Sequence, residues 1–76
     1  MITNEKTVAL SHVALTRAEL EVSKLVRDGS SNGEIGRLLG ISRHTVESHM
    51  KHIFVKLGIG SRVQLAVLVA RRDDAA

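Results

Sequence analysis

The chain has 76 residues, of which 43% are hydrophobic and 1% aromatic, and its formal net charge is +3. This length suffices for one small domain with a modest core, and no stretch approaches the roughly 20 apolar residues that span a bilayer. Because cysteine is absent, disulfides and thiolate metal sites are excluded, and the Leu, Val and Ala content favours helices around an apolar core.

Residues 1–14 show no clear hydrophobic period and are interpreted as an N-terminal arm or linker. They lack the basic and then apolar regions of a signal peptide. We therefore expect a cytoplasmic protein that makes no contact with a membrane. The folded domain is expected at residues 15–72, followed by a short C-terminal tail at 73–76.

Three capping boxes mark three helix starts, because in such a box two side chains three residues apart satisfy each other's backbone amides. The boxes pair Thr16 with Glu19, Ser31 with Glu34, and Ser61 with Gln64. Ser42 supplies a fourth, simpler N-cap. The pattern predicts an all-α domain of four helices, at about residues 17–28, 32–39, 43–57 and 62–72.

Apolar residues recur on one side of each of the first three predicted helices. The residues expected to point inward are Val22, Leu25, Val26, Ile35, Leu38, Leu39, Val46, Met50, Ile53, Phe54 and Leu57. Gly33 and Gly36 weaken the second helix. Either tertiary packing alone holds that helix, or Gly36 permits a close helix crossing.

A short second helix, a tight turn at Gly40 and Ile41, and a longer third helix with a polar outer side form a helix-turn-helix. The charge is uneven along the chain: residues 37–72 hold seven basic residues and one acidic residue, whereas residues 1–36 hold four basic and five acidic. A basic second half suits an anionic partner such as the DNA backbone. The alternative is a solvated basic face with no partner.

The outer side of the third helix carries the candidate DNA-binding residues, because a recognition helix presents its N-terminal half to base edges. These candidates are Ser42, Arg43, His44, Thr45, Glu47, Ser48, Lys51 and Lys56. Lys51 is expected to donate to guanine acceptors or to a phosphate, and His44 and Ser48 are expected to reach bases. Thr45 and Lys56, on the flank, are expected to contact phosphates. An ordinary solvated helix face is the alternative for the whole set.

Glu47 stands out on this face because a carboxylate repels phosphates. It either selects a base, by accepting a hydrogen bond from a cytosine amino group, or forms a helix pair with Lys51 at i+4. Both interpretations stay open at the level of the sequence.

Three histidines, His44, His49 and His52, raise the question of a metal site. The chain offers no cysteine and, near them, one acid, Glu47, so we expect no metal. No nucleophile lies beside a recognisable base, and no glycine loop suits a nucleotide. We therefore expect neither an enzyme nor a cofactor.

The fourth predicted helix is apolar around most of its circumference, from Val63 to Ala70. Such a helix must be buried on more than one face. Because the core of so small a domain covers one face, the other is expected to meet a second copy of the chain, through Val63, Val67, Leu68 and Arg71. The alternative is a terminal helix covered by residues 1–14.

Taken together, these residues at their fixed spacing resemble the LuxR-type (GerE-type) helix-turn-helix domain of bacterial transcription regulators. The segments that carry the resemblance are Leu15-Thr-Arg-Ala-Glu-Leu-Glu-Val22, Gly29, Ser31-Asn-Gly-Glu-Ile35, Leu39-Gly-Ile-Ser42, Thr45-Val46, His49, Ile53, Lys56-Leu57-Gly58 and Ser61-Arg62 with Leu65. The resemblance implies a four-helix domain whose third helix enters the major groove and whose fourth forms a two-fold dimer contact on a roughly palindromic site.

The resemblance also assigns roles to particular positions. Base and phosphate contacts of the family carry over to Lys51, Ser48, Thr45 and Lys56. This chain departs from the family at Glu47, where a DNA-contacting Lys is usual. It departs again at Gly33-Glu34-Ile35-Gly36, where the family usually reads Lys-Glu-Ile-Ala.

The function that we expect is therefore sequence-specific binding of double-stranded DNA by a homodimeric transcription regulator. RNA polymerase is a further candidate partner. The alternative is a protein-interaction module that binds a regulator or a polymerase subunit through the fourth helix. Regulators of this family commonly carry a receiver or ligand-binding domain before this one, so the chain is either a free-standing regulator or the output domain of a larger response regulator.

Overall fold

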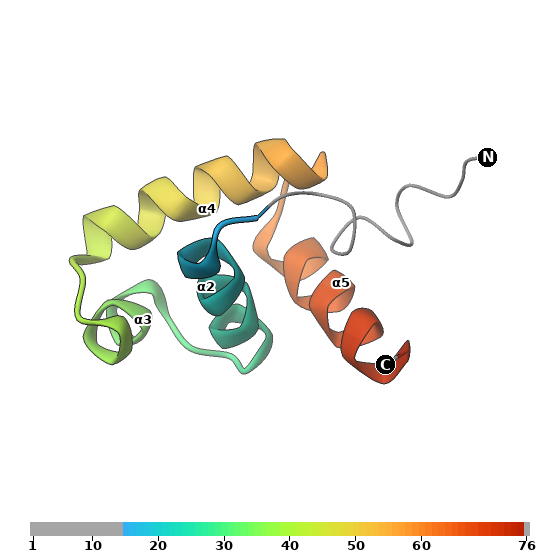
Figure 1. Cartoon of the computed structure of the whole chain (residues 1–76), viewed down its shortest axis with the longest axis horizontal. Coiled ribbons are helices and arrows are strands. Elements are labelled where there is room, and N and C mark those ends of the chain that lie inside the picture. Colours follow the sequence, from blue (N-terminus) through green and yellow to red (C-terminus); the bar gives the residue numbers. More distant parts are fainter. Residues whose placement is uncertain (1–14, 76) are drawn as a thin grey trace.

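The computed structural model of the chain describes residues 15–75. Within that range it consists of four helices and no strands: α2 (Arg17–Arg27), α3 (Asn32–Leu39), α4 (Arg43–Leu57) and α5 (Arg62–Ala75). Figure 1 shows α4 extending along one side of the domain, with α3, α2 and α5 beneath it in that view. The predicted all-α, four-helix fold is confirmed. The predicted arm at residues 1–14 lies outside the described residues.

Two of the predicted capping boxes form with both of their hydrogen bonds. The Thr16 amide donates to Glu19 Oε1 at 2.9 Å, and the Glu19 amide donates to Thr16 Oγ1 at 3.1 Å. Ser31 and Glu34 make the equivalent bonds at 2.7 and 3.1 Å. Each box satisfies two backbone donors that the first turn of a helix otherwise leaves without a partner.

The start of α5 differs from the predicted box. The Gln64 amide donates to Ser61 Oγ at 3.2 Å, as expected, but Gln64 Oε1 accepts from the Gly60 amide at 2.8 Å, one residue before the cap. At the start of α4, Ser42 Oγ accepts from the Thr45 amide at 3.0 Å, which confirms the simple N-cap. The Gln64 side chain of α5 therefore holds the connection between α4 and α5.

Glycines in the left-handed region follow three of the helices. Gly29, Gly40 and Gly58 have φ angles of +89°, +71° and +66°, which a residue without Cβ adopts readily. α2 accordingly ends at Arg27 with Asp28 as its C-cap, one residue earlier than predicted.

Both ends of α5 are tied to the rest of the domain by arginine side chains. Arg62 donates to Asn32 Oδ1 at 2.7 Å and to the Ser30 carbonyl, and Arg27 of α2 forms an ion pair with Asp73. The Asp73 pair holds the last turns of α5 against α2, and the helix continues past residue 72, where the sequence predicted its end. The charge of Arg62, counted in the sequence toward a basic surface, thus serves the fold.

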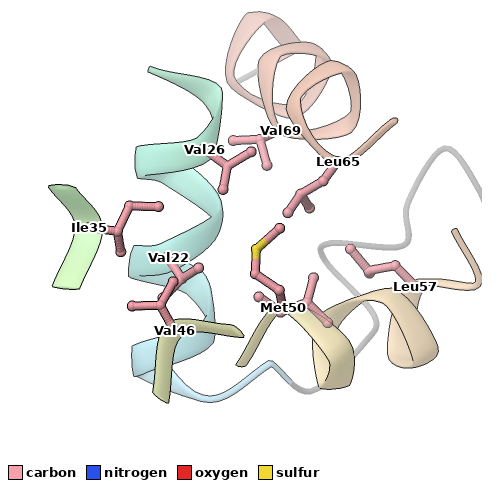
Figure 2. Close-up of a cluster of buried hydrophobic side chains, with 9 residues drawn as sticks. Val22, Val26, Ile35, Val46, Met50, Leu57, Leu65 and Val69 are labelled. Carbon is pink, nitrogen blue, oxygen red and sulfur yellow. The ribbon is translucent and has the colours of Figure 1, made fainter. Parts of the chain in front are cut away.

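One apolar core joins the four helices (Figure 2). Its buried members are Val22, Val26, Ile35, Val46, Met50, Ile53, Leu57, Leu65 and Val69. α2 lies at the centre, in contact with α3, α4 and α5. Figure 2 shows the Met50 side chain of α4 between the valines of α2 and Leu65 of α5. The inner side of α4 therefore faces α2, and its opposite side faces solvent.

Leu38 is a residue whose predicted inward orientation is wrong. It is 65% exposed, whereas Ile35 and Gly36 are buried and Leu39 is half-buried. Residues of a helix are separated by about 100° around its axis, so Leu38 lies well off the narrow strip that α3 buries. Leu25 and Phe54 are half-buried and pack against the core.

Gly36 decides how closely the turn between α3 and α4 packs. A Cβ at this position would lie 2.7 Å from the Ile41 carbonyl oxygen, and the Ile41 amide donates to the Gly36 carbonyl at 2.9 Å. The sequence left open whether Gly36 permits a close helix crossing. The close approach is instead to the backbone of the turn, which folds back onto the end of α3.

The break between α4 and α5 bends the chain by 68°. No single helix among residues 15–75 is long and apolar enough to cross a membrane, and α4 and α5 meet that criterion only as a bent pair.

Candidate nucleic-acid interface

The outer face of α4, defined here as Arg43, His44, Glu47, Ser48, Lys51 and Val55, lies opposite the side that packs on α2. Arg43, His44, Ser48 and Lys51 are exposed, and Glu47 is partly exposed. Helical spacing places His44, Glu47, Ser48 and Lys51 within about two turns of one another on a single side, and Arg43 lies beside them at the exposed start of the helix. The structure therefore brings together most of the DNA-binding residues that the sequence predicted.

Ser42 and Thr45 lie where α4 begins, and their hydroxyl groups contact each other. Ser42 Oγ lies 2.9 Å from Thr45 Oγ1 and also accepts from the Thr45 amide. Because the Ser42 oxygen already caps the helix, its main role within the chain is to fix the first turn. Gly36 and the turn before Ser42 position that first turn against α3.

The Glu47 carboxylate lies near two side chains one turn before it, the Arg43 guanidinium and the His44 imidazole. Glu47 Oε2 lies 3.4 Å from Arg43 Nε, and Glu47 Oε1 lies 4.0 Å from His44 Nδ1. The sequence-based pair of Glu47 with Lys51 at i+4 is wrong, because in the described part of the chain the carboxylate pairs with Arg43 at i−4. The negative charge that the sequence placed on this face is thereby matched by a neighbouring guanidinium.

Lys51 takes part in no ion pair among residues 15–75, and it is exposed at the middle of the outer face. Its ammonium group has three donors, and no carboxylate among the described residues forms an ion pair with it. Lys51 is therefore well suited to donate to an anionic or hydrogen-bond-accepting partner.

Lys56 has a different environment from Lys51. Its Nζ donates to Glu19 Oε1 at 2.7 Å, and the Glu19 side chain is only 5% exposed. The same carboxylate oxygen also accepts from the Thr16 amide, so the ion pair joins the end of α4 to the capping box of α2. The predicted phosphate contact of Lys56 stays a prediction, but the structure gives this ammonium group a role inside the domain.

The pKa of the Glu19 carboxyl shows the net effect of this environment. Burial raises the pKa, but hydrogen bonds from Lys56 and the Thr16 amide, together with the Lys56 charge, outweigh burial and hold it below the ordinary value of 4.5. Glu19 is therefore a paired carboxylate at neutral pH. Its charge is matched within the domain and does not add to the surface.

Val55 is a feature of the outer face that the candidate list from the sequence left out. It is 82% exposed and lies one turn after Lys51 on the same side. A helical projection of the sequence already places it opposite the buried side, so the signal was present. The polar residues around it drew attention to hydrogen bonding, whereas an exposed valine offers an apolar contact.

The candidate dimer residues on α5 fall into two groups. Val63 and Val67 are 71% and 43% exposed, and Arg71 is exposed as well, whereas Leu68 is half-buried and packs against the core. Leu65 and Val69 on the opposite side are buried. α5 thus buries one side in the domain and leaves a stripe of valines in solvent.

The described part of the chain holds no group of three His, Cys, Asp or Glu side chains that could bind a metal ion. His44 and His52 are exposed on α4, and His49 is half-buried at the edge of its inner side. The three histidines do not converge on one point.

Comparison with known proteins gives a consistent result. Residues 13–69 match the sequence family described as bacterial regulatory proteins of the luxR family. The chain is 46% identical over 61 residues to an HTH-type transcriptional regulator of Mycobacterium bovis and 43% identical over 63 residues to the transcriptional regulatory protein LiaR of Bacillus subtilis. It is 45% identical over 69 residues to the transcriptional regulatory protein TdiR of Thauera aromatica.

These alignments cover most of this chain but a small part of each relative. They include 80%, 83% and 90% of the chain, and 7%, 30% and 30% of the Mycobacterium, Bacillus and Thauera proteins. The chain therefore spans less than a third of the length of these relatives. The similarity concerns the helix-turn-helix domain.

Proposed function

Because this chain belongs to the luxR family of bacterial regulatory proteins, we propose that it binds a specific sequence of double-stranded DNA with α4 in the major groove. We also propose that it acts in the cytoplasm, where the chromosome of a bacterium lies. The observation that carries the proposal is the outer face of α4, where Lys51 stands exposed and without an ion pair in the described part of the chain.

The contacts that we propose divide by chemistry. Lys51 donates to guanine acceptors or to a phosphate, and His44 and Ser48 reach base edges. Thr45 and the first turn of α4 lie toward the phosphate backbone, where a helix N-terminus favours negative charge. Lys56 is left out of this set because Glu19 holds its ammonium group.

The test is the affinity of a single lysine variant for DNA. A selection from a random duplex pool first identifies the preferred site, and Lys51→Ala is then expected to bind that site about tenfold more weakly, because one specific base contact is worth roughly 1–3 kcal/mol. The fold should be unchanged, since Lys51 is exposed.

Lys24→Ala is the matched control, because it removes the same charge from a different helix, the last turn of α2. It should leave the affinity for the selected site within about twofold. Equal affinity of Lys51→Ala and the parent chain would contradict the role proposed for α4.

We also propose that two copies pair through α5, so that the site on DNA is roughly palindromic. The support is the stripe of Val63 and Val67, which the core of the domain leaves in solvent although both side chains are apolar. A two-fold contact repeats one surface on both copies, and the two reading helices then meet two half-sites related by the same symmetry.

Sedimentation of charge variants tests this pairing. Val67→Glu should shift the chain toward monomers and weaken binding to paired half-sites more than to a single half-site. Val55→Glu is the matched control, because it adds the same charge to an exposed valine of α4 and should leave the sedimentation of the free protein unchanged. A Val67→Glu chain that stays dimeric would move the contact elsewhere.

The exposed valines of α5 also favour a second candidate function, a protein-interaction module that docks a regulator or a polymerase subunit. Salt separates the two candidates. Affinity for DNA falls steeply as salt rises, because phosphate contacts release counterions, whereas apolar docking on α5 changes little. A chain that binds no duplex more tightly than random sequence would favour the docking function.

A further inference from the structure

Glu47 is the acid on the outer face of α4, and its carboxylate holds the side chain of Arg43. Glu47 Oε2 lies 3.4 Å from Arg43 Nε, and the guanidinium remains largely exposed. His44 Nδ1 lies 4.0 Å from the other carboxylate oxygen. Arg43 and His44 thus lie in the first turn of α4, the part of a recognition helix that comes closest to the bases, and Glu47 lies one turn after them.

The atoms used in this pair leave the other end of the guanidinium available. An arginine side chain has five donors arranged in a planar fork, and Glu47 contacts the Nε side of that fork. The two terminal nitrogens are the donors with which an arginine contacts O6 and N7 of a guanine. A carboxylate at Nε therefore orients arginine without occupying the donors that read a base.

Orientation matters because arginine otherwise has many rotamers. Fixing a long side chain costs conformational entropy at the moment of binding, and a side chain that is already held loses less. In water an exposed pair at this spacing adds little stability. In a groove from which water is displaced, the same pair is stronger and its geometry is better defined.

The carboxylate has an opposite effect on overall affinity. It lies on a surface that approaches phosphates, so it opposes the binding of every DNA sequence to a similar extent. A residue with this balance lowers affinity for all sites and raises discrimination between them. A contribution to discrimination therefore explains an acid on this surface better than a contribution to affinity does.

Building on the DNA-binding function proposed above, we propose that Glu47 is a positioning residue that holds Arg43 for contact with a guanine. The pair, and not Glu47 by itself, then determines which base is preferred opposite the first turn of α4.

The experiment compares the base preferences of the parent chain, Glu47→Gln and Arg43→Lys, each determined by selection from the same random duplex pool. The parent should prefer guanine at one position of each half-site. Arg43→Lys keeps the charge but lacks the fork, so it should lose that preference by about tenfold at the same position. Glu47→Gln should bind all sequences about threefold more tightly and lose most of the same guanine preference.

A double variant tests whether Glu47 and Arg43 act together. If Glu47 acts through Arg43, Arg43→Lys combined with Glu47→Gln should lose no more guanine preference than Arg43→Lys alone. His44→Ala is the control for the weaker contact and should keep the guanine preference. All four variants should unfold at nearly the same temperature as the parent chain, because the residues concerned are surface-exposed or partly so.

Two results would overturn the inference. One is a Glu47→Gln chain that keeps the full guanine preference. The other is a Glu47→Gln chain that loses a preference for cytosine while Arg43→Lys keeps that preference, because Glu47 would then contact the base directly. A parent chain without any sequence preference would instead contradict the proposed function itself.

Discussion

The two ends of α4 use their charged residues in different ways. At the beginning, Arg43, His44 and Glu47 form weak, exposed pairs on the solvent side, and Lys51 follows without an ion pair in the described part of the chain. At the end, Lys56 donates to a nearly buried carboxylate of another helix. One end is thus available to a partner, and the other is committed to the domain.

Lys51 and Lys56 show how little of this difference depends on residue type. Both are lysines on one helix, five positions apart, a spacing that rotates the second by about 140° relative to the first. That rotation turns Lys56 toward α2, where the Glu19 carboxylate accepts hydrogen bonds from both Lys56 and the Thr16 amide. Position around the helix axis, and not charge, separates a candidate DNA contact from a structural ion pair.

The largest effect is expected from a change that disturbs the beginning of α4. Gly36→Val would place a Cβ 2.7 Å from the Ile41 carbonyl oxygen and push the turn away from α3. Overpacking against backbone should lower the free energy of unfolding by about 3 kcal/mol, as measured by urea titration. Gly33→Ala is the control, since its Cβ would meet nothing closer than 3.9 Å, and it should be neutral or slightly stabilising. Similar losses in both variants would mean that α3 itself, and not the turn, is the sensitive element.

A smaller loss is expected at the other end of the helix. Lys56→Met keeps the aliphatic stem but leaves the Glu19 carboxylate without its cation, so the free energy of unfolding should fall by about 2 kcal/mol. Lys51→Met should change it by less than about 0.5 kcal/mol. DNA affinity should respond in the opposite order. A Lys56→Met chain that keeps its stability but loses about one unit of the salt slope would restore the phosphate contact predicted from the sequence.

The smallest effect is the dependence of stability on acid. Because the pKa of folded Glu19 lies below 4.5, its carboxylate stabilises the fold above that pH, and this stabilisation is lost as pH falls through the lowered value. The midpoint temperature of thermal unfolding, measured between pH 7 and pH 3, should therefore decrease once the pH is below about 4.5. Glu19→Gln should flatten this decline. Glu34, whose pKa is also lowered but whose box is exposed, provides the comparison, and Glu34→Gln should flatten it less.

Much of the fold could be predicted because its signals are local. Capping boxes and left-handed glycines act over three or four residues, and they placed the four helix starts and the ends of α3 and α4 correctly, with the end of α2 one residue late. The larger exceptions depended on contacts across the chain. α5 continues past residue 72 because Asp73 meets Arg27, and Leu38 is exposed because α3 buries only a narrow strip.

The positions of the candidate site residues on α4 were predictable for the same reason. The outer face of α4 follows from helical spacing, so Ser48 and Lys51 could be placed there from the sequence. Lys56 and Arg62 could not be distinguished from surface cations, because their partners lie 37 and 30 residues away along the chain. For Glu47 the spacing allowed a partner on either side, and only the structure selects Arg43.

The bend between α4 and α5 fixes the angle between the two helices. Gln64 accepts a hydrogen bond from the Gly60 amide within the connection, and Arg62 joins the start of α5 to Asn32 of α3 and to the Ser30 carbonyl before it. The direction of α5 relative to α4 is therefore set by the domain. In a dimer joined through α5, the separation of the two reading helices is then built into the protein. Each base pair inserted between half-sites shifts one of them by about 3.4 Å and rotates it by roughly a tenth of a turn. A rigid dimer tolerates little shift or rotation of a half-site, so the spacing between the half-sites becomes part of the DNA sequence that is recognised.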